Sequence, residues 1–75
     1  MKEQEVTRLL QRIRRNCEAI ARIMDEPHYP GACRAINRRV QVFAIREEQL
    51  MGLVGGRESH HLAFRVFNEV LHIRQ

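Results

Sequence analysis

Apolar residues in the first third of the chain follow the spacing of one helix face. Between residues 3 and 26 they step by four and three residues in alternation, at Val6, Leu10, Ile13, Cys17, Ile20 and Met24. This is the spacing of the apolar a and d positions in three successive heptads, which form one seam along a helix. Leu9 and Ile23 widen the seam, so the helix suits a globular bundle at least as well as a two-stranded coil. We predict a helix over about residues 3–26, ended by Pro27 because the residue before a proline leaves the α region.

A second helix is predicted over about residues 31–54, between breakers at 27–31 and Gly55-Gly56. Pro30 suits its first turn, where a missing N–H costs nothing. Its apolar stripe consists of Ile36, Val40, Phe43, Leu50 and Val54. Val42 and Ile45 lie off that stripe, so more than one neighbour must cover this helix. Alternation over residues 39–45 permits a competing strand, but no second strand-like run exists to pair with it.

A third helix is predicted over about residues 58–73, with Ser59 as its N-cap. Its apolar residues wrap more than half of its surface, which one hairpin cannot cover. We therefore expect it to cross onto a second copy of the chain. The predicted fold is all-α: one domain over residues 1–75, with an antiparallel helical hairpin and a short third helix assembled as a homodimeric bundle. The expected dimer interface consists of Val42, Ile45, Phe64, Phe67 and Leu71.

Length and composition support self-association and a cytoplasmic location. A chain of 75 residues has a marginal core of its own. Two cysteines are too few for a disulfide scaffold, the charged start does not resemble a signal peptide, and no apolar run is long enough to span a membrane. The formal net charge is +4, and Lys2 is the only lysine among 13 basic residues. Arginine suits planar, bidentate contacts to carboxylate or phosphate.

Arginines recur on the outer side of the first two helices. Arg8, Arg15 and Arg22 repeat every seven residues, and Arg12 lies beside them. Arg34 and Arg38, followed by Arg39, open the second helix. Such a pattern is typical of a solvated helix face, and it also fits a surface that binds phosphate or an acidic partner. The spacing leaves open whether the two sets form one surface.

The remaining polar residues suggest structure rather than catalysis. Glu47 lies on the apolar stripe of the second helix, where we expect an ion pair with Arg8 and Arg12. No nucleophile or second carboxylate is expected beside it, so we predict no enzyme activity and no cofactor. Cys17 and Cys33 are expected to be small buried side chains, roughly 10 Å apart along the hairpin and too distant for a disulfide.

No metal site is predicted within one chain. His60 and His61 are neighbours that point in different directions, and neither pairs with a second histidine at chelating distance. A metal site built across a dimer stays open as an alternative.

Part of the chain resembles a known family. Arg12-Ile13, Ala19-Ile20, Arg22-Ile23, Glu26 and Tyr29, followed by Cys33-Arg34-Ala35-Ile36, resemble the first two helices of small helical repressors that sense copper, nickel or formaldehyde. In that family a cysteine opening the second helix and a histidine later on the same helix form the sensing site. The resemblance assigns the first role to Cys33, whereas Gly55-Gly56 interrupts the helix before His60 or His61.

These patterns predict a small regulatory protein that acts as a homodimer and inhibits or recruits a partner protein. The groups expected to bind the partner or phosphate are Arg8, Arg12, Arg15, Arg22, Arg34 and Arg38. The alternative is a DNA-binding transcriptional regulator that uses the same arginines, including a metal- or aldehyde-responsive repressor.

Overall fold

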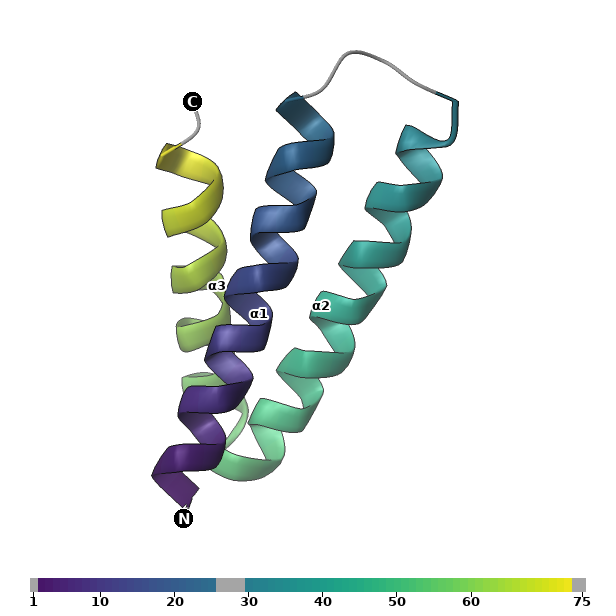
Figure 1. The fold of residues 1–75 in the computed structure, drawn as a ribbon. Coiled ribbons are helices and arrows are strands. Elements are labelled where there is room, and N and C mark those ends of the chain that lie inside the picture. The colour runs from purple at the N-terminus through teal and green to yellow at the C-terminus, as the bar shows by residue number, and fades with distance from the viewer. Residues whose placement is uncertain (1, 26–29, 74–75) are drawn as a thin grey trace.

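The computed structural model, which describes residues 2–25 and 30–73, contains three helices. These are α1 (Lys2–Asp25), α2 (Ala32–Val54) and α3 (Gly56–Ile73). The first two run antiparallel, and α3 turns back to run in the direction of α1 (Figure 1). Each helix packs against both others. The prediction of an all-α fold with three packed helices is confirmed, and the alternative strand over residues 39–45 is wrong because these residues are helical.

Glycines set where α2 begins and ends. Gly31 precedes α2 with a φ of 89°, and Gly55 follows it with a φ of 91°. A Cβ is strained in that region, so both positions favour glycine. The Gly31 carbonyl accepts the N–H of Ala35 at 2.9 Å, and the Gly55 N–H donates to the Met51 carbonyl at 2.9 Å. We had predicted that Pro30 lies in the first turn of α2. It lies instead in the turn before the helix, next to Gly31.

Ser59 does not cap α3. The helix already starts at Gly56, because Gly55 alone, with a φ of 91° and a ψ of 161°, separates α2 from α3. The hydroxyl of Ser59 donates to the Gly56 carbonyl at 2.9 Å, one turn back within the helix. The N-cap prediction is therefore wrong. The predicted end of the first helix at Glu26 and Pro27 lies outside the described residues.

All three helices contribute to one core. Its buried apolar residues are Ile13, Cys17, Ile20, Ala21, Phe43, Leu50, Ala63, Val66 and Val70. Phe43 packs edge-on against Phe64 and Phe67, each with ring centroids 5.5 Å apart. The same chain therefore covers much of the apolar surface of α3 that we had assigned to a second copy.

Asn16 is a buried polar residue inside this core, only 5% exposed. Its amide Nδ2 donates to the Arg39 carbonyl at 2.8 Å, which ties the middle of α1 to α2. Its Oδ1 is also buried and has no partner among the described residues. The apolar seam alone could not reveal Asn16, because it lies beside the seam and not in it.

The two cysteines differ in environment. Cys17 is fully buried, and desolvation raises the pKa of its thiol to about 11, opposed by the Arg14 charge and assisted by Glu18. Cys33 is exposed, and both thiols are free. The prediction of a buried side chain thus holds for Cys17 and is wrong for Cys33, which lies on the outer side of the first turn of α2.

Candidate functional site

The predicted binding arginines are all on the surface. Exposed side chains belong to Arg8, Arg12, Arg15, Arg22, Arg34 and Arg38. Within residues 2–25 and 30–73, no ion pair engages them.

One stripe of α2 lies beside α1. It consists of Arg39, Val42, Arg46, Gln49 and Leu53, which step by three and four residues. Its first residue accepts the hydrogen bond from Asn16 of α1. Its last two residues line a surface depression together with Glu5, Arg8, Leu9 and Arg12 of α1. The stripe therefore adjoins α1 at both of its ends, and Arg8 and Arg12 lie at the end formed by Gln49 and Leu53.

We call this surface the arginine groove. It comprises the depression lined by Glu5, Arg8, Leu9, Arg12, Gln49 and Leu53, together with Arg39, Val42 and Arg46, which precede Gln49 on the same stripe of α2. Leu9, Val42 and Leu53 are half-buried between the helices, and Arg46 donates to the Gln49 side chain at 3.1 Å. Glu5 is its one acidic residue. Arg15 and Arg22 continue the row of Arg8 on the outside of α1, while Arg34 and Arg38 flank the groove on α2.

Arg14 serves a different purpose from the other arginines of α1. Its guanidinium lies 2.6 Å from the Glu69 carboxylate of α3, which also pairs with Arg65 at 3.5 Å. The hydrogen bond from Arg14 is the main cause that lowers the pKa of Glu69. This ion pair joins α1 to α3, and it lies on the side of α1 away from the arginine groove.

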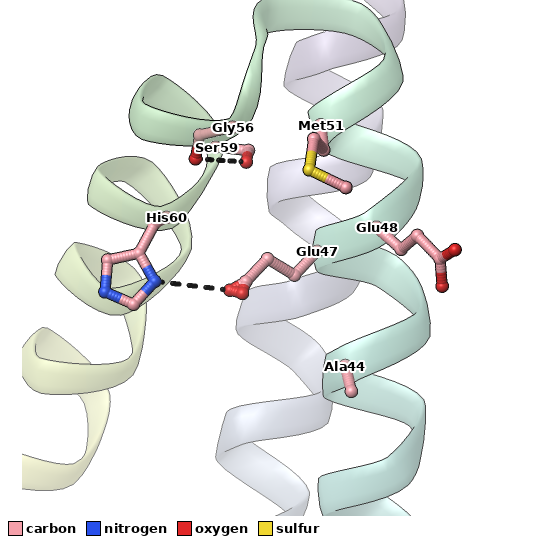
Figure 2. Close-up of a pocket in the computed structure, with 7 residues that line it drawn as sticks. All are labelled: Ala44, Glu47, Glu48, Met51, Gly56, Ser59 and His60. Carbon is pink, nitrogen blue, oxygen red and sulfur yellow. Dashed lines mark hydrogen bonds and ion pairs between the residues drawn. The ribbon is translucent and has the colours of Figure 1, made fainter.

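The opposite flank of α2 faces α3 and exposes apolar side chains beside Glu47 and Glu48. Val40, Met51 and Phe64 remain 48%, 47% and 37% exposed there. Met51 and Ala44 line a depression that reaches Gly56 and His60 of α3 (Figure 2). We call Val40, Ala44, Met51 and Phe64 the apolar strip. It and the arginine groove lie on two different flanks of α2.

Glu47 belongs to the side of the apolar strip. Its Oε1 lies 3.6 Å from His60 Nδ1, and that buried oxygen has no hydrogen bond to the described residues (Figure 2). The His60 ring in turn packs against the Phe64 ring, with centroids 4.4 Å apart and the ring planes tilted by 40°. The predicted pairing of Glu47 with Arg8 and Arg12 is wrong. Its position four residues after Phe43, which contacts α3, is the reason.

The five residues predicted to form a dimer interface do not share one face. Phe64, Phe67 and Leu71 lie on the flank of α3 that adjoins α2, where Phe67 and Leu71 are half-buried. Val42 lies in the arginine groove. Ile45 is 54% exposed on the outside of α2. The structure therefore brings the three α3 residues together and separates them from the two residues of α2.

No cluster of three or more His, Cys, Asp or Glu side chains in the described part of the chain could hold a metal ion. None of its helices combines the length and the apolar character that crossing a bilayer requires.

Comparison with known proteins gives no relative. No protein-family model, curated protein or solved structure matches this chain. Inference about function therefore rests on the two surfaces themselves.

Proposed function

We propose that the protein is a small, non-enzymatic regulator that acts as a homodimer and inhibits or recruits a partner protein. The observation that carries this proposal is the separation of two open surfaces by α2. One flank exposes Val40 and Met51 of α2 with Phe64 of α3, and the other exposes Arg8 and Arg12 with Glu5 beside them. An apolar surface suits a permanent contact, and a charged one suits a reversible contact.

The apolar strip is the surface on which two copies pair. Two arginine grooves facing each other would place like charges together, which costs free energy at a symmetric interface. The strip carries no arginine or lysine, and a second copy would cover the side chains that the small core leaves open. Beside it, Glu47 lies 3.6 Å from His60, and Glu48 lines the same depression.

Light scattering on the purified chain tests the dimer. Val40→Glu and Met51→Glu each place a charge on the strip and are expected to yield monomers. Met24→Glu is the matched control, because Met24 is 61% exposed and lies at the far end of α1. A wild-type chain that remains monomeric at micromolar concentration refutes this part of the proposal.

The arginine groove is the surface that meets the partner protein. Its guanidinium groups can each hold a carboxylate in a bidentate pair. Affinity capture with the wild-type chain is expected to recover a protein in fixed ratio, and recovery should fail with Arg8→Ala and Arg12→Ala combined. Retention of the same protein by the double variant would contradict this assignment.

DNA binding is the second candidate, and the exposure of the six arginines favours it. Neutralising several phosphates gives an affinity that falls steeply with salt. Electrophoretic mobility shifts with duplex DNA at low salt test it, and absence of a shift removes it. A sensor version further requires that Cys33→Ala abolishes a response of DNA affinity to metal or aldehyde.

A further inference from the structure

The hairpin of α1 and α2 offers a groove on each side, and α3 fills only one of them. On the filled side, Ala63, Val66 and Val70 of α3 are buried in the core. On the other side lies the arginine groove, where Leu9, Val42 and Leu53 remain half-buried. An antiparallel pair of helices can pack a further helix on such a side at a usual interaxial distance of about 8–10 Å.

The groove has an apolar floor between two charged edges. Leu9 and Leu53 face each other across the depression at one end, with Arg8 and Arg12 beside them on α1. On α2, Arg46 follows Val42 by one turn and holds the Gln49 side chain. A ligand that matches this surface needs an apolar stripe with negative charge on both sides.

We propose that the arginine groove receives an amphipathic helix of the partner protein, with leucine-like residues along its centre and Asp or Glu on its two flanks. This inference rests on the proposed function and names the chemistry of the partner. The incoming helix packs its apolar residues on Leu9, Val42 and Leu53, and its carboxylates pair with Arg8, Arg12 and Arg46. The result is a four-helix arrangement, the helix-in-groove mode of peptide recognition.

The length of the groove sets the length of the helix. The stripe of α2 that adjoins α1 runs from Arg39 to Leu53, about 14 residues or about 21 Å at 1.5 Å per residue. A partner helix of about four turns covers this distance. Duplex DNA offers the negative charge without the apolar stripe, so the half-buried leucines favour the helix over phosphates.

Fluorescence anisotropy with synthetic peptides tests the proposal. The probe is a labelled helical peptide with a leucine stripe flanked by glutamates. One matched peptide carries serine in place of each leucine, another carries lysine in place of each glutamate, and a labelled DNA duplex is the fourth probe. We expect only the leucine and glutamate peptide to bind the wild-type dimer well, with both replacements weakening it by at least about tenfold, which corresponds to about 1.4 kcal/mol.

Protein variants locate the binding site. Arg12→Ala is expected to weaken binding of the leucine and glutamate peptide severalfold. Arg57 is an exposed arginine at the start of α3, and Arg57→Ala is expected to leave binding unchanged. Leu53→Ser should weaken binding of the peptide while the chain stays folded, and circular dichroism checks the helical content. If Leu53→Ser unfolds the chain, Arg12→Ala and the serine peptide still decide the question.

Three outcomes overturn the proposal. In the first, the serine peptide binds as well as the leucine peptide, which shows that the apolar floor is not used. In the second, the DNA duplex binds in a way that depends on Arg12 while the peptide does not bind, which assigns the groove to nucleic acid. In the third, none of the four probes binds at low salt. A monomeric wild-type chain that still binds the leucine peptide through Arg12 contradicts the proposed dimer alone.

Discussion

Replacing Asn16 with leucine should stabilise the protein, although it deletes a hydrogen bond between helices. Asn16 is 5% exposed, and its Nδ2 donates to the Arg39 carbonyl at 2.8 Å. Its Oδ1 is buried without a partner in the described chain. Leucine has a similar shape and no polar atoms, so the substitution removes one satisfied and one unsatisfied group together.

The magnitudes favour leucine. The lost hydrogen bond costs about 1 kcal/mol net, and the Arg39 carbonyl keeps the acceptor role that every interior helix carbonyl has. Removing the orphaned Oδ1 recovers about 1–3 kcal/mol of desolvation. Leucine also has the higher helix propensity, worth a few tenths of a kcal/mol. The expected net effect of Asn16→Leu is a gain of about 1 kcal/mol in the free energy of unfolding.

Urea denaturation followed by circular dichroism measures this change at one fixed protein concentration, because dimerisation makes apparent stability concentration-dependent. The midpoint should rise while the slope stays the same. Asn16→Asp is the matched control: it replaces the donor by a second acceptor facing the Arg39 carbonyl and should cost at least about 2 kcal/mol. A loss of 1 kcal/mol or more in Asn16→Leu would show that Oδ1 is satisfied, and the reasoning would be refuted.

Four further predictions follow from the structure. Leu50→Ala should cost about 2–5 kcal/mol because Leu50 is fully buried, whereas Ile45→Ala on the exposed side of the same helix should stay within about 0.5 kcal/mol, both by urea denaturation. Gly55→Ala should cost about 1–3 kcal/mol, since Gly55 has a φ of 91° and a ψ of 161° that only glycine adopts readily. Thiol reagents should modify Cys33 rapidly and Cys17 only on unfolding, as mass spectrometry of the native chain would show. Because burial raises the pKa of Cys17 from 9.0 to about 11, its contribution to stability is present below pH 9.0 and is lost as pH rises toward about 11, and equal midpoints at pH 8 and pH 10.5 would contradict this.

Local signals explain why the three helices could be predicted. The heptad seam of α1 includes Ile13, Cys17 and Ile20, and all three are buried. Helix periodicity depends on residues within a few turns, so the pattern identifies the inward face without knowledge of the neighbour. Gly55 similarly marks the break between α2 and α3 through its own backbone conformation.

Pairing across helices could not be predicted in the same way. Glu47 was expected to meet Arg8 and Arg12, but it lies opposite His60, because the rotation of α2 about its axis turns that stripe toward α3. The same rotation separates Val42 from Phe64, which the sequence alone placed in one interface. Apolar residues cover such a wide arc of α2 that either side could have faced α1.

Sequence alone determined the helical class, the three segments and the inward face of α1, since periodicity and chain breakers act over a few residues. Only the tertiary structure decided that α3 packs on both other helices, that Arg14 pairs with Glu69 and that Arg8 and Arg12 lie beside Gln49 and Leu53 of α2. These features depend on how each helix is rotated against its neighbours. That rotation is set by the joint packing of all three, which no single stretch of residues encodes.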